Sequence, residues 1–200
     1  NRAQPAAPAH LERDALEDGV LRGMYLFRPS PRKRVRKHVQ LLGSGAIMHE
    51  VLAAAELLER DFGVAAHVWS VTSYKALYRD ALDAERWNRL HPAEEPRRAY
   101  VHTVLADTKG PIVAASDYVK MLPDSLSRHA PRPIHALGTD GFGRSDARAE
   151  LRDHFEVDAR HVAFAALSAL AADGQLSKDD LAAALGALGI DPDKRNPHVA

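Results

Sequence analysis

The stretch HVQLLGSGAIMHEVLAAAELLERDFGVAAHVWSVTS, residues 38–73, has the pattern of a strand, a helix and a second strand in immediate succession. Its middle part repeats apolar residues at helical spacing, namely Ile47, Val51, Ala54, Ala55, Leu58 and Phe62. Gly63 follows where a helix C-terminal cap belongs. Parallel strands need a crossover of this kind, and such crossovers are right-handed. The sequence therefore predicts a βαβ unit within an α/β sheet.

On the amino-terminal side, residues 20–27 and 38–42 favour strands and flank a basic stretch at residues 28–37. The cationic residues of this stretch are Arg28, Arg32, Lys33, Arg34, Arg36 and Lys37. We expect a hairpin with a charged tip, which is either solvated or an electrostatic docking surface for another protein. Residues 1–18 are rich in Ala, Pro and charge, so we expect an extended arm or linker before a domain at residues 19–200.

On the carboxyl-terminal side, helices and short apolar strands follow one another. We expect helices at residues 73–87, 99–106, 119–128, 146–155, 158–173 and 177–188, and buried strands at residues 112–116 and 134–137. Ser73, Asp158 and Ser177 are good N-terminal caps. This order of elements extends the α/β pattern along the chain.

Composition narrows the class of protein. The 200 residues include 27 basic and 27 acidic side chains, so no net field favours nucleic acid or an anionic membrane. No cysteine is present, which excludes disulfides, thiolate catalysis, cysteine zinc sites and iron–sulfur clusters, and is compatible with a cytoplasmic setting. The apolar runs are too short for a bilayer span, which needs about 20 residues.

Three glycine-rich or polar segments are candidate sites. Gly43, Ser44 and Gly45 lie between a strand and a helix and form either a tight structural turn or a phosphate site, although Met48 stands where a dinucleotide fingerprint needs a third glycine. In ERWNRLHP, residues 85–92, the side chains of Arg86, Trp87 and Asn88 predict a packed corner or an interface.

The third segment is GTDGFGRSDARAELRDHFEVD, residues 138–158. Its glycines permit a tight loop, Ser145 or Asp146 can accept the first helix N–H groups, and Asp140, Arg144 and Asp146 can cross-brace the loop. It is either a loop stabilised by its own charged residues or a loop whose polar groups contact a second subunit. The candidate interface or structural residues are Asp140, Gly141, Phe142, Gly143, Arg144 and Asp146.

No segment carries a catalytic or metal-binding pattern. The eleven histidines include no pair spaced i, i+4 around a glutamate, and His154 and His161 flank an expected helix break. Neither Ser44 nor Ser145 lies in a G-x-S-x-G turn. We therefore expect no catalytic or metal-ligating residue in this chain.

Five segments together resemble one family. QLLGSGAI, DAERWNRLHP, AASDYVK, GTDGFGRSDARAELRDHFEVDARHV and NPHVA occur in this order and are similar to the C-terminal domain of homodimeric bacterial pyruvate dehydrogenases. The resemblance covers residues 19–200. It implies a three-layer α/β sandwich, a mixed and mainly parallel sheet with helices on both faces, and a role in building the dimer. The basic residues 28–37 depart from the family in charge.

The resemblance also implies a longer enzyme. Such enzymes bind thiamine diphosphate and Mg²⁺, decarboxylate pyruvate and reductively acetylate the lipoyl group of the dihydrolipoyl acetyltransferase core. The cofactor and substrate residues are expected in domains before Asn1, so none is placed in this chain. The implied partners are those other domains, a second copy and the acetyltransferase core.

Two alternatives remain open. The chain is also compatible with the C-terminal domain of a transketolase or another 2-oxo acid dehydrogenase. From a different class, it could be a stand-alone module that binds a protein or a nucleotide through the βαβ unit and the basic tip. A reading frame that begins hundreds of residues before Asn1 would favour the enzyme.

Overall fold

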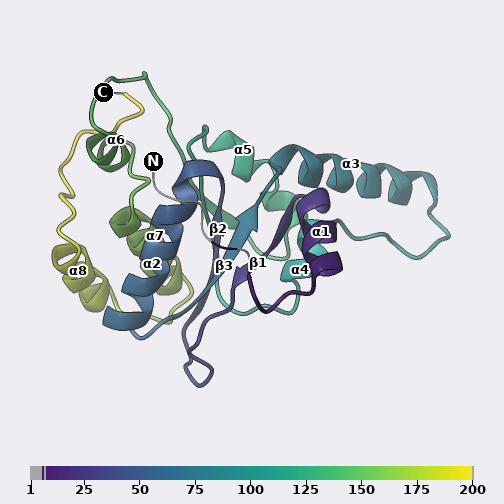
Figure 1. Ribbon diagram of the computed structural model, residues 1–200, viewed down its shortest axis with the longest axis horizontal. Helices are drawn as coiled ribbons and strands as arrows, with labels where there is room; N and C mark the ends of the chain where they lie inside the picture. Colours follow the sequence, from purple (N-terminus) through teal and green to yellow (C-terminus); the bar gives the residue numbers. More distant parts are fainter. Residues whose placement is uncertain (1–5, 7, 200) are drawn as a thin grey trace.

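A computed structural model describes residue 6 and residues 8–199, and its centre is one five-stranded sheet (Figure 1). The strand order is β1-β3-β2-β4-β5. Their bounds are Met24–Arg28 for β1, His38–Gly43 for β2, Ala65–Val71 for β3, Ile112–Ala115 for β4 and Ile134–Leu137 for β5. Only β1 is antiparallel to its neighbour, β3, within this sheet. The mixed, mainly parallel sheet expected from the sequence is confirmed.

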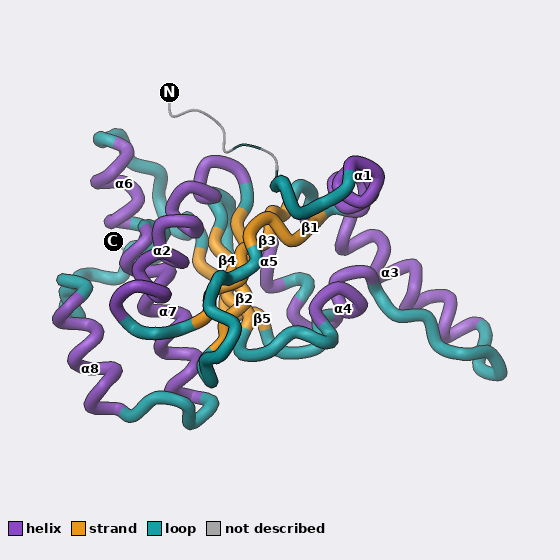
Figure 2. Tube along the Cα trace, turned by 60° about the horizontal axis from the view of Figure 1, so that its bottom comes forward, coloured by secondary structure: helices purple, strands orange, loops and turns teal. Residues whose placement is uncertain are grey.

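Helices cover both faces of the sheet, as Figure 2 shows. On one face, α2 (Met48–Asp61) and α7 (Ala159–Ala172) share a core with alternate strand residues such as Val39 and Leu41. On the other face, α3 (Tyr74–Leu90) and α4 (Tyr100–Leu105) pack on Leu42 and Trp69. Strands buried on both faces explain the near-continuous apolar runs in the sequence. The chain thus forms three layers with two cores of its own.

The βαβ unit is confirmed, but the hairpin predicted before it is wrong. β2 pairs with β3 and β4, whereas β1 pairs with β3 at the edge of the sheet. The crossover through α2 places β3 directly beside β2, so the only open side of β3 is left for β1. Residues 29–37 therefore cross the amino end of β3 instead of forming a hairpin tip.

This crossing segment is anchored at its start. Arg28 and Ser30 both donate hydrogen bonds to Glu59 of α2, at 3.1 and 2.7 Å. The cationic side chains that follow, including Arg32 and Arg34, are exposed. The segment is fixed where it leaves β1, and its charge faces solvent at the amino edge of the sheet.

The predicted arm at residues 1–18 is wrong in its second part. Helix α1 spans Arg13–Arg22 and ends at Gly23, whose φ of 108° is the left-handed cap that glycine favours. It also takes up Val20, which the sequence analysis assigned to a strand. Ion pairs at i, i+4, such as that between Arg13 and Glu17, support this exposed helix. The expectation for residues 1–5 and 7 lies outside the described residues.

The helices after β4 are shorter than predicted, whereas their caps agree with the sequence. Residues 119–128 contain only α5 (Met121–Asp124) and a 3₁₀ turn at Ser127–His129. α6 covers Arg148–His154, and α8 covers Lys178–Ala187. The side chains of Ser73, Asp158 and Ser177 accept backbone N–H groups as predicted. Over the described part of the chain, no helix has the length and apolarity of a bilayer span.

Candidate functional site

The carboxyl ends of β2, β4 and β5 bring three loops together at one edge of the sheet. These loops are residues 43–45, 116–121 and 138–146. The chain leaves β2 toward β3 on one side and leaves β4 toward β5 on the other. This reversal is a topological switch point, where open α/β sheets form their ligand crevices. We call these three loops the carboxyl edge.

The turn at residues 43–45 is filled by the protein itself. A Cβ on Gly43 would lie 2.9 Å from Met48 Sδ, so the glycine permits α2 to approach the strand. Gly45 has a φ of 53°, and the Asp117 carboxylate lies 3.1 Å from its Cβ position. The Ser44 hydroxyl donates to Ser116 Oγ at 2.9 Å. A phosphate at this turn would meet the negative charge of Asp117.

A buried tyrosine lies beneath the same turn. Tyr74 is 5% exposed, and burial raises the pKa of its hydroxyl above the ordinary value. Ser44 opposes this rise, but the Tyr74 hydroxyl forms no hydrogen bond of ordinary geometry with any described residue. Tyr74 therefore stays neutral at physiological pH and acts as packing.

The base of the loop at residues 138–146 is held against residues 116–121 by close backbone packing, hydrogen bonds and an ion pair. A Cβ on Gly138 would lie 2.5 Å from the Tyr118 carbonyl oxygen, and the Thr139 amide donates to that oxygen at 2.9 Å. Asp140 accepts from the Lys120 amide at 3.3 Å and pairs with its ammonium group at 3.8 Å. Gly141 has a φ of 103°, and its Cβ position lies 2.3 Å from the Pro197 carbonyl oxygen.

The charged residues of this loop do not form the predicted cross-brace. The described contacts of Asp140 go to Lys120, not to Arg144 or Asp146. Asp146 accepts the Ala147 amide at 2.7 Å, one residue before α6, whose first turn has no side-chain cap. A Cβ on Gly143 would have nothing within 4 Å. The loop is therefore fixed at its start and open at its tip.

Large apolar side chains gather at this open edge. Their exposures are 63% for Tyr118, 50% for Val119, 77% for Met121 and 80% for Phe142. The contacts between Thr139 or Asp140 and residues 118–120 hold the two loops side by side. We call these four side chains the apolar patch. Exposed apolar groups on two adjoining loops are typical of an interaction surface.

A cavity of about 340 Å³ opens beside the apolar patch. One wall is apolar and consists of Ile47, Leu151, Phe155 and Val157. Gly141 and Gly143 contribute backbone to its lining. The charged groups that line it are Asp117, Arg144, Arg148 and Arg152.

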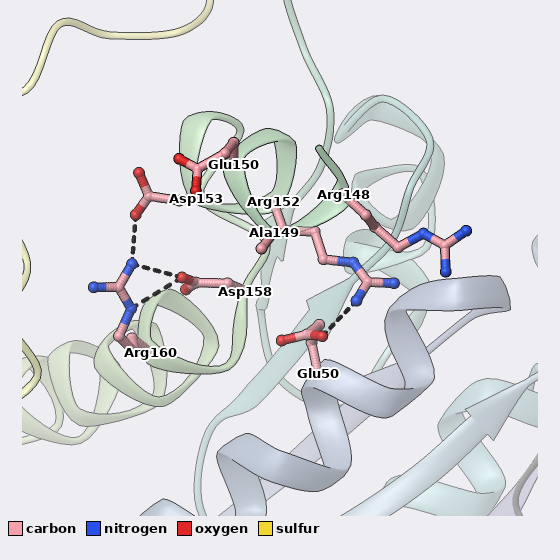
Figure 3. Close-up of a pocket in the computed structure, with 8 residues that line it drawn as sticks. All are labelled: Glu50, Arg148, Ala149, Glu150, Arg152, Asp153, Asp158 and Arg160. Carbon is pink, nitrogen blue, oxygen red and sulfur yellow. Dashed lines mark hydrogen bonds and ion pairs between the residues drawn. The ribbon is translucent and has the colours of Figure 1, made fainter. Parts of the chain in front are cut away.

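A second cavity, of about 510 Å³, lies where α2, α6 and α7 meet (Figure 3). Arg152 donates to Glu50 at 2.6 Å, and Glu50 also accepts the Ala159 amide at 3.1 Å. Arg160 bridges Asp153 and Asp158 (Figure 3). The charges of Arg152, Glu50, Arg160, Asp153 and Asp158 are thus paired within the cavity, and this network joins the three helices.

Asp158 is the centre of that network. Burial opposes its ionisation, but hydrogen bonds from His161 and Arg160 outweigh burial and hold the pKa of the carboxyl well below its usual range. Asp153, Asp158 and His161 could together offer three metal ligands, yet Arg160 already binds both carboxylates. Asp158 is the N-cap of α7, and the buried His161 contacts its carboxylate through both the backbone N–H and the ring.

The predicted corner at the end of α3 is a layered stack. The Trp87 ring lies between the His91 ring, with 4.3 Å between centroids, and the Arg97 guanidinium, 4.0 Å from its centroid. Asn88 accepts from the Arg97 amide at 2.7 Å and donates to the Arg97 carbonyl at 2.9 Å. Arg86 lies outside the stack and is exposed. The stack fixes the chain where it turns back from the far end of α3 (Figure 1).

Comparison with known proteins agrees with this architecture. The family described as Transketolase-like TK C-terminal domain matches residues 23–158. This chain belongs to that family. The matched region contains all five strands and the carboxyl edge and ends at the N-cap of α7. In this member of the transketolase C-terminal family, α7 then completes the cover of one sheet face.

The similar proteins of known name are pyruvate dehydrogenase E1 components. The chain is 48% identical to that of Pseudomonas aeruginosa and 49% identical to that of Haemophilus influenzae, each over 198 residues. It is 44% identical to that of Escherichia coli K12 over 201 residues. Each match covers at least 98% of this chain but only 22% of the relative. The chain therefore spans about a fifth of the length of these relatives.

Solved transketolases share the fold at low identity. A transketolase from Pichia stipitis has a TM-score of 0.54 and 16% identity, over 78% of this chain and 19% of that one. The transketolase from Campylobacter jejuni has a TM-score of 0.51 and 20% identity, over 74% and 19% respectively. These likenesses support the architecture of the transketolase C-terminal family.

The described residues of this transketolase-like domain do not fit thiamine diphosphate with Mg²⁺. Mg²⁺ prefers oxygen ligands in octahedral arrangement, usually from carboxylates and phosphates. The one group of three potential ligands among the described residues is bridged by Arg160. The turn at residues 43–45, which could cradle a diphosphate, faces Asp117.

Sequence reasoning missed several residues of the carboxyl edge. Asp117 follows a buried strand at the switch point, a position that could have identified it. Arg148 and Arg152 are spaced i, i+4, which places both on one side of α6. Glu50 falls outside the apolar repeat of α2, yet its side chain is only 14% exposed because α6 and α7 cover it. Such contacts between distant segments leave no local signal in the sequence.

Proposed function

We propose that this chain is the C-terminal, non-catalytic domain of a pyruvate dehydrogenase. In this proposal the complete protein is a cytoplasmic homodimer that decarboxylates pyruvate with thiamine diphosphate and Mg²⁺ and acetylates the lipoyl group of an acetyltransferase core. The identity to named pyruvate dehydrogenase E1 components supports it, as does the family match. The cofactor and the reacting groups belong to other domains of the longer polypeptide.

The observation that carries the domain's role is the apolar patch. Both faces of the sheet are already covered by the chain's own helices, so the patch does not complete a core of this domain. The relatives extend far beyond the matched 22% of their length, so a large surface is available to cover it. We infer that the patch and residues 140–146 dock against the rest of the polypeptide or a second copy.

The test uses the full-length protein. Phe142→Ser together with Met121→Ser removes two large side chains from the patch, and Leu21→Ser is a control at an 80% exposed apolar residue of α1. We expect the double variant to weaken dimerisation in sedimentation velocity and to lower pyruvate decarboxylation. A double variant that dimerises as tightly as the control would refute the docking role.

The catalytic part of the proposal has its own test. The 200-residue chain, supplied with thiamine diphosphate, Mg²⁺ and pyruvate, should release no carbon dioxide above background. Turnover by this chain would place the active site here and contradict the proposal. Comparing pyruvate decarboxylation with ketose transfer in the full-length protein distinguishes a pyruvate dehydrogenase from a transketolase.

A further inference from the structure

The cavity of about 340 Å³ at the carboxyl edge has a lining of two kinds. It contains the apolar side chains of Ile47, Leu151 and Phe155 together with the arginines Arg144 and Arg148. A small number of charged groups against an apolar wall is the usual composition of a small-molecule pocket, and such pockets measure roughly 300 to 1,000 Å³. The cavity also lies at the topological switch point of the sheet, where this fold class binds its ligands.

The arginines of this cavity differ in their partners. Arg152 is 14% exposed and donates to Glu50 at 2.6 Å and to the Ala46 carbonyl at 3.2 Å. By contrast, no described residue forms a hydrogen bond or ion pair with Arg144 or Arg148. In Figure 3 a dashed line joins Arg152 to Glu50, whereas none reaches the Arg148 guanidinium. Two guanidinium groups at one cavity thus have unused donors.

The charged groups in the lining give this cavity an excess of positive charge. Glu50 offsets the charge of Arg152, which leaves Arg144 and Arg148 with one carboxylate in the lining of this cavity, that of Asp117. Arg148 also lines the neighbouring cavity, where Glu150 lies. Arg144 and Arg148 are exposed, and ion pairs in water are weak, so charge alone does not define a ligand. The apolar wall adds the second requirement, since a fully hydrated inorganic ion gains nothing from Leu151 or Phe155.

We propose that this cavity binds a small organic anion, a carboxylate or phosphate monoester that carries an apolar body. The anionic group lies between Arg144 and Arg148, where guanidinium donors match planar or tetrahedral oxyanions. The apolar body lies on Leu151 and Phe155. Asp117 accepts a hydrogen bond from a hydroxyl or ammonium group of the ligand. This binding site is separate from the decarboxylation chemistry and does not depend on the proposed enzyme.

The 200-residue chain is suited to a direct test because its two cores are built from its own helices and sheet. Naphthyl phosphate and neutral naphthol share an apolar body and differ in the anionic group. Isothermal titration calorimetry should show naphthyl phosphate binding at least about tenfold more tightly than naphthol, because a charge-assisted hydrogen bond is worth about 1.5 to 3 kcal/mol. Inorganic phosphate should bind more weakly than naphthyl phosphate.

Variants locate the binding. Arg144→Ala and Arg148→Ala should each weaken naphthyl phosphate binding about tenfold, while Arg89→Ala, at an exposed arginine of α3 far from the cavity, should leave it unchanged. Gly143→Leu places a side chain at the cavity lining where a Cβ has open space, so the variant should fold and bind more weakly. Circular dichroism of each variant checks folding before titration.

Three results would overturn the proposal. Equal affinity for naphthyl phosphate and naphthol would show that the arginines do not recognise the anion. Binding unchanged in Arg144→Ala, Arg148→Ala and Gly143→Leu would place the ligand elsewhere. No saturable binding at millimolar concentration would show that the cavity does not hold this class of ligand. None of these results affects the dimerisation test of the apolar patch.

Discussion

Two glycine-rich turns lie at the same edge of the sheet, and they use glycine for different purposes. At residues 43–45 the missing side chains let Met48, Val51 and Asp117 approach, so the turn is closed by the protein itself. At residues 138–146 Gly138 and Gly141 lie against neighbouring backbone and fix the base of a loop, and its tip carries an exposed phenylalanine and an arginine that no described residue binds. Glycine content alone does not distinguish a packed turn from a presented loop. The two are distinguished by the atoms that a side chain at each glycine would meet.

The largest expected effect comes from the closed turn. Gly43→Val would drive its side chain into Met48 Sδ and Val51, because even a Cβ lies 2.9 and 3.1 Å from them. We expect a loss of about 3 kcal/mol in the free energy of unfolding, as for overpacked cores. Urea denaturation of the 200-residue chain measures it. A loss below about 1 kcal/mol would show that α2 can move away from the turn to make room for the new side chain.

The base and tip of the open loop can be compared within one motif. Gly141 has a φ of 103° and a carbonyl oxygen 2.3 Å from its Cβ position, whereas Gly143 has neither constraint. Gly141→Val should cost about 2 kcal/mol in unfolding free energy, and Gly143→Val should cost less than about 0.5 kcal/mol. Thermal melting of both variants compares the two losses of stability. Equal losses would mean that the loop does not divide into a fixed base and an open tip.

A third prediction concerns the network behind the open loop and its dependence on pH. The pKa of Asp158 is lowered in the folded protein by His161 and Arg160, which outweigh burial. The stabilisation is therefore present above the unfolded pKa of about 3.9 and is lost as pH falls below it. Asp158→Asn keeps a capping oxygen but loses the charge, so we expect a loss of about 1 kcal/mol at neutral pH.

Stability curves at several pH values test this prediction. The difference between the parent chain and Asp158→Asn should be constant near neutrality and shrink below about pH 4. Asp146→Asn is the control, since its carboxylate is exposed and, among the described residues, accepts only the adjacent Ala147 amide. A difference between parent and Asp158→Asn that does not change with pH would mean that the ionised Asp158 does not stabilise the contact of α6 with α7.

The comparison also shows which features a sequence can predict. The βαβ unit, the N-caps and the Trp87 corner follow from short-range spacing, and the structure shows them. The hairpin prediction failed because strand neighbours are chosen by the crossover through α2, not by proximity in sequence. The helix at Arg13–Arg22 was missed because its apolar spacing is weak and its support comes from exposed ion pairs.

Only part of the candidate site could be predicted from the sequence, and its geometry could not. The sequence singled out residues 138–146, yet it paired Asp140 with Arg144 and Asp146, whereas Asp140 binds Lys120. Lys120 lies 20 residues earlier, and only the adjacency of β4 and β5 brings it there. Asp117 and Arg148 joined the cavity for the same reason. Side chains that meet across parallel strands depend on strand order, which local patterns do not contain.

The smallest expected effect belongs to the tip of the open loop. Phe142 is 80% exposed, so Phe142→Ser should change the unfolding free energy of the 200-residue chain by less than about 0.5 kcal/mol. Melting at two protein concentrations sharpens the test, because self-association through the tip would make the melting temperature of the parent rise with concentration. Phe142→Ser would then remove that dependence while leaving the dilute value unchanged. A large loss in dilute solution would mean that Phe142 packs within its own domain, and the contrast between the closed turn and the open loop would fail.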